Sequence, residues 1–268
     1  MIPLFSTNQI REIDGYAINE LGMPGLSLME NAAFQIFFAV INHTSHLKRR
    51  EKVAVLCGKG NNGGDGFAAA RHFANNEFSV IVLHVGGEND MSPDCLANYK
   101  ILSNMAKENP GIVIKKYSSE KDLRYIIGSD IIIDALLGSG ASGSLKEPYG
   151  SIVDALNKIK AYKVAVDIPT GLDADTGFTD KVFTADLTVT LGEYKKGLFF
   201  GDGHAAAGGI IKGDIGIGFN FFDRMDSFEY LIEPEDVLEN LPKKKKDINK
   251  YSSGKVLTIA GSGAFPGA

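Results

Sequence analysis

The sequence predicts an α/β protein with a doubly wound, mostly parallel sheet and helices on both faces, in the manner of a Rossmann-like three-layer sandwich. Two observations support this prediction. Beyond residue 50, apolar runs of four to six residues alternate with single helical segments, and two further helical segments precede the first of these runs. Strands separated by single helices need crossover connections, which are right-handed and place helices on both faces of the sheet.

Two helices are expected before the first strand. The first begins at Ser6, which forms a capping box with Gln9. Its apolar residues recur at helical spacing up to Gly22, namely Ile10, Ile13, Ala17 and Leu21. The second covers residues 28–41 and carries a broad apolar face, which indicates that it packs against a large surface.

The alternating part of the chain defines the remaining elements. Strands are expected at residues 53–57, 80–85, 112–117, 131–134, 163–168 and 185–191, with a last edge strand within 208–222. Helices are expected near residues 65–75, 93–107, 119–127 and 149–159. The same pattern predicts that residues 1–222 form one domain.

The C-terminal residues have a different character. Residues 223–250 are charged and include four consecutive lysines, which predicts a solvated linker. Residues 251–268 resemble a new strand that enters a glycine turn. Because a strand without partners cannot form a domain, we expect 251–268 to be the truncated start of a second one.

Composition excludes several classes of protein. The chain has 268 residues with 28 Lys and Arg against 33 Asp and Glu, a net charge of −5, which excludes a nucleic-acid binder that relies on bulk positive charge. No apolar run approaches the ~18 residues needed to cross a bilayer. Two cysteines, without metal-ligand spacing, indicate neither a disulfide framework nor a zinc site. We therefore expect a cytoplasmic protein.

The first motif with chemical content is the glycine-rich stretch Gly58–Gly66, which follows the first strand of the sheet. Such a stretch before a helix lets backbone amides approach a phosphate or diphosphate. Its glycines formally satisfy the G-x-G-x-x-G pattern of dehydrogenases, but the second strand does not end in the acid that holds a ribose, and Glu88 comes late. The two asparagines and Asp65 also favour a ligand site over a purely structural turn.

Two aspartates end neighbouring strands of the predicted sheet. Asp134 and Asp167 are each followed by a loop rich in Gly, Ser and Thr. Each alone would also suit a helix cap or a turn, but together they favour a crevice at the carboxyl edge of the sheet. Lys195 and Lys196 follow the strand that ends at residue 191. Two interpretations are open: one of the lysines reaches a phosphate, or both form a solvated pair at the strand end.

The oxygen donors near these strand ends suit a hard cation. Asn62, Asp134 and Thr170 supply amide, carboxylate and hydroxyl oxygens, and soft ligands are absent. With one strong anionic ligand, a monovalent ion is favoured over magnesium. If a cation holds Asp134 ionised, Asp167 in a less polar part of the crevice would have a raised pKa and act as a general acid or base.

Three motifs in this order, GNNGGDG, DALLGSG and DIPTGLDADTG, resemble those of NAD(P)H-hydrate epimerases, the YjeF N-terminal-domain family. The similarity begins in the segment Arg11–Ala33 and continues to about Gly218. Residues 249–268 are similar to the entry of the ribokinase-like, ADP-dependent NAD(P)H-hydrate dehydratase domain that follows the epimerase in bifunctional members. Because the rest of that domain is missing, no dehydratase activity is expected.

The resemblance implies roles for individual residues. Potassium would be coordinated by Asn62, Asp134 and Thr170, where members usually have serine in place of the threonine. Asp167 would be the catalytic residue, near the reacting ring. The remaining substrate-binding positions implied are Asn61, Asn62, Gly63, Gly64, Asp65, Gly138, Ser139, Gly140, Ala141, Ser142, Gly143 and Ser144, together with Asp167 and Lys195. Lys195 matches a lysine common in the family, without an assigned role.

The resemblance also implies the activity. The substrate would be the hydrated dinucleotide NAD(P)HX, whose R and S epimers at C6 the enzyme would interconvert in cofactor repair, either by loss and return of the hydroxyl or by ring opening. Potassium is the cofactor implied, and no organic cofactor is needed. The alternative is a non-catalytic nucleotide-binding or dimerisation scaffold of the same fold. We expect a homodimer formed through the two leading helices.

Overall fold

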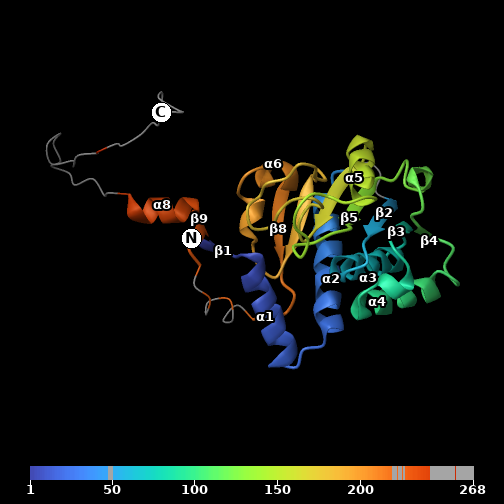
Figure 1. Ribbon diagram of the computed structural model, residues 1–268, viewed down its shortest axis with the longest axis horizontal. Helices are drawn as coiled ribbons and strands as arrows, with labels where there is room; N and C mark the ends of the chain where they lie inside the picture. Colours follow the sequence, from blue (N-terminus) through green and yellow to red (C-terminus); the bar gives the residue numbers. More distant parts are fainter. Residues whose placement is uncertain (48–50, 219–221, 223–224, 226, 242–256, 258–268) are drawn as a thin grey trace. The chain divides into compact units, whose positions relative to one another are not determined.

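The computed structural model describes residues 1–47, 51–218, 222, 225, 227–241 and 257 (Figure 1). The chain divides into two compact units. The larger, residues 3–230, contains every residue predicted to bind substrate or metal. The smaller combines residues 1–2 with 231–268.

The larger unit is built on a sheet of seven parallel strands in the order β4-β3-β2-β5-β6-β7-β8. The strands are β2 (Lys52–Cys57), β3 (Ser79–His84), β4 (Ile112–Lys116), β5 (Ile131–Ala135), β6 (Tyr162–Val166), β7 (Leu187–Leu191) and β8 (Gly209–Gly213). The predicted doubly wound fold is thus confirmed. The strand order reverses between β2 and β5, whose last paired residues are Cys57 and Ala135. Doubly wound sheets bind ligands at the carboxyl edge of such a switch point.

Helices cover both faces of the sheet (Figure 1). One face packs against α2 (Gly25–His43), α3 (Asn61–Asn75) and α4 (Pro93–Met105), and the other against α5 (Tyr149–Lys158) and the 3-10 segment η2 (Glu120–Tyr125). The remaining elements of this unit include α1 (Thr7–Asn19), α6 (Gly203–Ala207) and the short segments η1 (Glu88–Asp90) and η3 (Lys196–Leu198). The helix expected near 119–127 is therefore a 3-10 segment.

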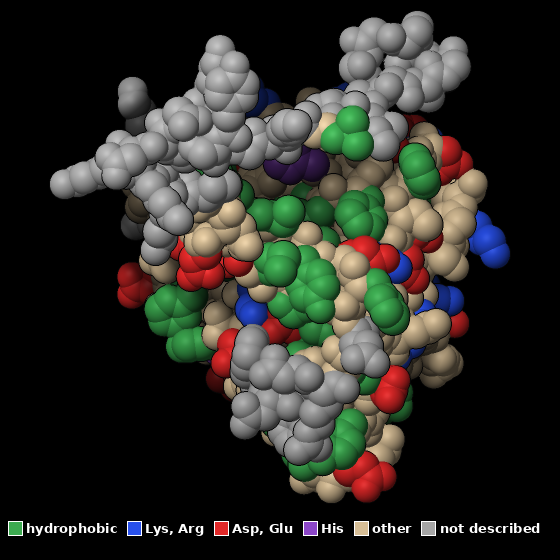
Figure 2. Space-filling model, turned by 90° about the vertical axis from the view of Figure 1, so that its left-hand side faces the viewer, with side chains coloured by type: hydrophobic (Ala, Val, Ile, Leu, Met, Phe, Trp, Pro, Cys, Tyr) green, Lys and Arg blue, Asp and Glu red, His purple; other side chains and the backbone are tan. Residues whose placement is uncertain are grey.

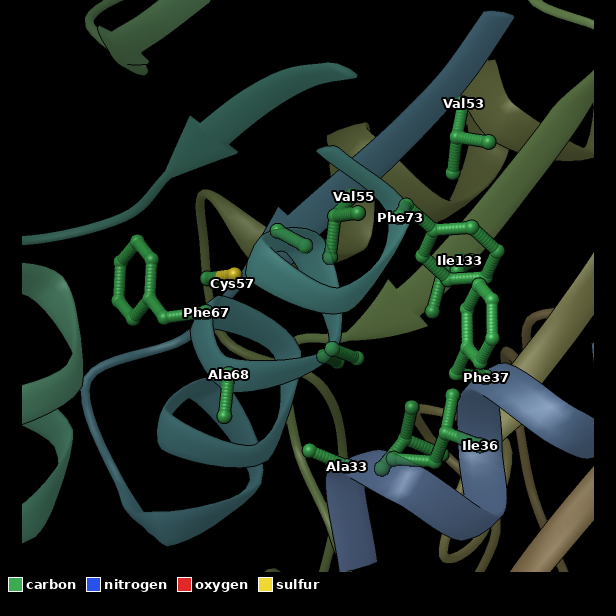
Figure 3. Close-up of a cluster of buried hydrophobic side chains, with 14 of the residues drawn as sticks. Ala33, Ile36, Phe37, Val53, Val55, Cys57, Phe67, Ala68, Phe73 and Ile133 are labelled. Carbon is green, nitrogen blue, oxygen red and sulfur yellow. The ribbon is translucent and has the colours of Figure 1, made fainter. Parts of the chain in front are cut away.

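The central strands are buried on both faces. In Figure 3, Val55 and Cys57 of β2 lie against α3, whose Phe73 lies close to Phe37 of α2. The alternate residues of the same strand pack in the core of the opposite face. This double burial explains why the strands are continuous apolar runs in the sequence.

Helix α1 forms as its sequence predicts. The Ser6 backbone N–H donates to Gln9 Oε1 at 2.8 Å and the Gln9 N–H donates to Ser6 Oγ at 3.4 Å, which completes the capping box. The apolar side that faces the protein packs on α2 and on the segment after β8, through Ile10, Ile13 and Ala17. Leu21, expected on that side, is exposed.

Helix α3 begins at Asn61, four residues earlier than expected. A Cβ at Gly63 would lie 2.0 Å from the carbonyl oxygen of Gly58, so glycine allows the first turn of the helix to pass directly over the end of β2. Gly60, in extended conformation, is the N-cap. Most of the motif expected as a loop is thus the first turns of a helix.

The predicted linker contains described structure. Strand β9 (Glu229–Leu231) pairs with β1 (Ile2–Leu4) in a two-stranded sheet, and α8 (Pro234–Asn240) follows. Residues 251–268 lie, apart from one position, outside the described residues, so the predicted linker and second domain stay predictions. In the part of the chain that the structure describes, no helix is long and apolar enough to span a membrane.

Candidate functional site

Three predicted site residues from separate segments meet at the carboxyl edge of the sheet. Gly138 follows β5, Asn62 lies in the first turn of α3, and Asp167 follows β6. A Cβ at Gly138 would lie 3.1 Å from Asn62 Oδ1 and 3.2 Å from Asp167 Oδ2. Both polar side chains therefore border the same small space, which glycine keeps open.

Asp134, the last polar residue of β5, is fully buried and accepts three hydrogen bonds. Its Oδ2 accepts from the Thr170 N–H at 2.8 Å, and its Oδ1 accepts from the Thr170 hydroxyl at 2.7 Å and from the Leu136 N–H at 3.1 Å. Burial raises the pKa of Asp134 to about 6, against the opposing effect of these hydrogen bonds. Asp134 and Thr170, which the sequence predicts to share a metal site, are thus in direct contact.

Asn62 is the unusual member of this group. Both its side-chain oxygen and its side-chain nitrogen are buried without a hydrogen-bond partner in the described structure. A buried amide left unpaired is costly, and a bound ion or water is one of the partners that can satisfy it. An amide carbonyl, a hydroxyl and one carboxylate form an oxygen donor set that suits a hard monovalent cation. The residues predicted to bind potassium therefore fit that ion chemically.

Asp167 has a strained backbone. Its φ of 68° is in the left-handed region, and the Ile168 N–H donates across it to the Val166 carbonyl oxygen at 2.8 Å, forming a γ-turn. Such a conformation costs on the order of 1–3 kcal/mol and is concentrated at functional sites. The turn directs the carboxylate to the Ser139 N–H, which donates to Oδ2 at 3.0 Å.

Lys195 is the partner of this carboxylate. Its side chain is 1% exposed, and Nζ lies 2.6 Å from Asp167 Oδ1 while it also donates to the Leu191 carbonyl oxygen. Burial acts to raise the pKa of Asp167, but the Lys195 ammonium and the Ser139 hydrogen bonds outweigh it, and the pKa is lowered. The expectation of a raised pKa at Asp167 is therefore wrong, as is the expectation that Lys195 is solvated or free to reach a phosphate.

Two further carboxyl groups belong to this cluster. Burial, and then the nearby charges of Asp167 and Asp14, raise the pKa of Asp65 well above its usual range, with Lys195 opposing. Asp14, which is half-buried on α1, also has a raised pKa, because burial and Asp167 outweigh Lys195. Sequence reasoning missed Asp14. The available signal was its position on the same helical face as Thr7.

The first turn of α3 points its amides toward this edge. The Gly64 N–H donates to the Gly60 carbonyl oxygen at 3.1 Å, so helix geometry leaves the N–H groups of residues 61–63 without an acceptor inside the helix. Ser92 Oγ donates to Asn61 Oδ1 at 2.8 Å and holds that side chain at the helix start. Free amides and the positive end of the helix dipole favour an anion here.

A cavity of about 620 Å³ lies between the loops that follow β5 and β6. Five predicted substrate-binding residues line it, namely Gly138, Ala141, Ser142, Gly143 and Ser144. Residues 61–65, Ser139, Gly140, Asp167 and Lys195 do not line it. Because Ser139 binds Asp167 while its neighbours line the cavity, the loop 138–144 borders both the charged cluster and the open space.

These features define the class of the molecule: a Rossmann-like α/β protein with buried acids, a helix N-terminus and a glycine-rich loop at its topological switch point. Residues 25–197 match the family described as YjeF-related protein N-terminus. Together with the relatives below, this match shows that the chain belongs to the YjeF N-terminal-domain family of NAD(P)H-hydrate epimerases.

Relatives of two lengths are similar to the chain. It is 36% identical over 217 residues to the NAD(P)H-hydrate epimerase of Rhodopirellula baltica, covering 78% of this chain and 85% of that protein. It is 37% identical over 250 residues to the bifunctional NAD(P)H-hydrate repair enzyme Nnr of Methanothermobacter thermautotrophicus, covering 92% of this chain and 46% of that protein. The chain thus spans about half the length of this bifunctional relative.

One solved structure has the same fold. The crystal structure of the yeast protein YNL200c superposes with a TM-score of 0.69 at 24% sequence identity, covering 85% of this chain and 96% of that chain.

Proposed function

We propose that the chain is an NAD(P)H-hydrate epimerase, an isomerase that interconverts the R and S epimers at C6 of NAD(P)HX. The observation that carries the proposal is the meeting of Asn62, Gly138 and Asp167 at the switch point of a chain whose relatives are named as epimerases. Geometry and family thus support the same reaction.

The proposed substrate lies along the carboxyl edge. Its diphosphate binds the free amides of residues 61–63, where the helix dipole stabilises negative charge. The loop 138–144 contacts the rest of the dinucleotide, because it borders both the cavity and the Asp167 side chain. This arrangement brings the hydrated ring to the space beside Gly138.

The chemistry requires an acid and a base, whether the hydroxyl departs and returns or the ring opens and closes. Burial acts to raise the pKa of Asp167, but Lys195 and the Ser139 hydrogen bonds outweigh it and favour the carboxylate, whereas burial raises the pKa of Asp65 well above its usual range and favours the protonated carboxyl. Asp65 is therefore our candidate for the acid, and Asp167 is our candidate for the carboxylate that faces the positive charge developing on the ring. Two acids with pKa values moved apart are the usual arrangement for such paired roles.

Potassium is proposed at Asn62, Asp134 and Thr170. The support is twofold: the side-chain amide of Asn62 is buried without a partner in the described structure, and the carboxyl group of Asp134, in contact with Thr170, is buried and has a raised pKa. When bound, the ion would supply a positive charge that holds the Asp134 carboxylate ionised. The residues themselves already order the loop, since Thr170 Oγ1 accepts from the Leu137 N–H at 3.0 Å.

The alternative is a scaffold that binds nucleotides or dimerises without catalysis. Helices α1 and α2 and the turn between them support a homodimer, because five apolar side chains there are each more than 40% exposed, namely Ile18, Leu21, Leu26, Phe34 and Phe38. On the face shown in Figure 2, hydrophobic side chains gather in groups separated by polar and charged ones. The homodimer stays a proposal.

The proposal is tested with separated R and S epimers of NADHX and NADPHX, whose ratio is followed by chromatography against a buffer control. Wild-type protein is expected to accelerate the approach to equilibrium, and Asp167→Asn, which tolerates the left-handed backbone, is expected to lose at least about a hundredfold in kcat. Rates equal to the buffer control for the wild-type protein would favour the scaffold.

A further inference from the structure

Helix α1 is attached to the two loops that form the proposed site. The Thr7 N–H donates to Asp175 Oδ1 at 2.7 Å and its hydroxyl donates to Asp175 Oδ2 at 2.8 Å, in the loop after β6. One turn later, Arg11 Nη2 donates to the Gly140 carbonyl oxygen at 3.4 Å, in the loop after β5. The first half of α1 therefore lies beside both loops.

The segment before α1 is joined to the chain around Lys195. The Phe5 N–H donates to the Tyr194 carbonyl oxygen at 2.8 Å, and the Lys196 N–H donates to the Phe5 carbonyl oxygen at 3.1 Å. These two backbone bonds flank Lys195 on both sides. The start of α1 and the backbone of Lys195 are thus held in one arrangement.

Asp14 continues the face defined by these contacts. Spacings of four and three residues from Thr7 to Arg11 to Asp14 place the three side chains on the same side of a helix. Glu12 lies off this face and is exposed. The face that contacts the site loops thus has a carboxyl group as its third member.

The charged groups that shift the pKa of Asp14 belong to the proposed site. Asp167 and Lys195 both act on its pKa, and Asp14 in turn acts on the pKa of Asp65. The four groups come from α1, α3 and the segments after β6 and β7, and Arg11 is the charged neighbour on α1 itself. The charge of the buried Lys195 ammonium therefore acts on three carboxyl groups, of which Asp167 is in direct contact with it.

We propose that Asp14 is a positioning residue of the epimerase site, which acts from α1 on the Asp65 carboxyl and the Asp167–Lys195 ion pair. This inference rests on the proposed function. In this proposal, helix α1 borders the site in addition to packing on the rest of the fold. Because one ammonium cannot balance three carboxylates, the charge of Asp14 favours the state in which Asp65 keeps its proton.

The test compares Asp14→Asn with Glu12→Gln, which removes the same charge from an exposed position of the same helix. Asp14→Asn is expected to lower kcat at least about tenfold with KM within about twofold, because binding contacts are retained. The alkaline limb of its pH profile is expected to move to lower pH, since a negative neighbour is lost. Asp14→Glu is expected to retain most of the activity, and Glu12→Gln all of it.

The outcomes separate the two proposals. Epimerisation by the wild-type protein together with equal kcat in Asp14→Asn and Glu12→Gln would overturn the role of Asp14 alone. Equal losses of kcat in Asp14→Asn and Asp14→Glu, without a shift in either limb of the pH profile, would show that Asp14 acts through packing. This result would also overturn the role proposed for Asp14. Should Asp14→Asn not fold by circular dichroism, Asp14→Ser replaces it in the same comparison. If the wild-type protein does not accelerate epimerisation, the proposed function itself fails, independently of the comparison between the Asp14 and Glu12 variants.

Discussion

The Lys195 ammonium lies 2.6 Å from the Asp167 carboxylate, and both side chains are withdrawn from solvent. A buried ion pair of this kind costs desolvation, and removal of one partner leaves an uncompensated charge. The pair lowers the pKa of Asp167, whereas burial, followed by the nearby charges of Asp167 and Asp14, raises the pKa of Asp65.

Lys195→Met is expected to destabilise the protein by about 3–5 kcal/mol at pH 7, because Asp167 loses its cation in a buried site. Since the folded pKa of Asp167 is lowered, the stability from the pair is present above its unfolded pKa of about 3.9 and is lost as pH falls through the folded pKa. The difference from wild type should therefore shrink in acid. Urea unfolding at several pH values measures it.

Lys196→Met is the matched control for this variant. Its ammonium lies 3.6 Å from Glu229 Oε1 with greater exposure, so its loss is expected to cost at most about 1 kcal/mol. Equal penalties for the two lysine variants would contradict the role given to the buried pair.

Potassium is expected to stabilise the protein more at pH 7.5 than at pH 5. The folded pKa of Asp134, about 6, is above its unfolded value, so stability is greatest below the unfolded pKa and falls as pH rises through the folded pKa. A cation that binds the ionised carboxylate offsets this loss only where Asp134 is ionised. Melting temperatures in potassium chloride and choline chloride of equal ionic strength measure the effect.

Asp134→Asn serves as the control, because it cannot ionise. It is expected to remove the difference between the two pH values. Melting temperatures that rise equally in both salts would show that no specific potassium site exists.

Thr170→Val is expected to cost about 1–3 kcal/mol, since the Asp134 carboxylate and the Leu137 N–H each lose a buried partner. Thr170→Ser retains the hydroxyl and is expected to lose much less. Chemical unfolding of both variants gives the comparison. A valine variant as stable as the serine variant would mean that these hydrogen bonds do not hold the loop.

Gly138→Ala is expected to reduce kcat at least about tenfold while the protein stays folded. The added methyl group would press on Asn62 and Asp167 and displace them by a few tenths of an ångström, and small displacements in a site are costly. Gly209→Ala, whose new Cβ would meet no atom closer than 3.7 Å, is the control. Full activity in the Gly138 variant would place the reacting ring elsewhere.

Much of this site follows from local sequence patterns. Asp134 and Asp167 each end an apolar run, and parallel strands bring their carboxyl ends to one edge of the sheet, so the proximity of Asp167 to Asn62 was predictable. The capping box at Ser6 was equally local.

The rest depends on tertiary contacts. The start of α3 at Asn61 depends on the approach of Gly63 to Gly58, and glycines alone indicate a loop. The burial of Lys195 and the position of Asp14 arise because the segment before α1 pairs with a segment about 190 residues later. No periodicity in the sequence shows that pairing.

A crystal structure of the protein with potassium and a bound NAD(P)H hydrate tests the central claim most directly. The account predicts the hydrated ring within hydrogen-bond distance of Asp167, the diphosphate on the amides of residues 61–63, and the ion on Asn62. A dinucleotide bound away from the space beside Gly138, with Asp167 out of reach of the ring, would contradict it.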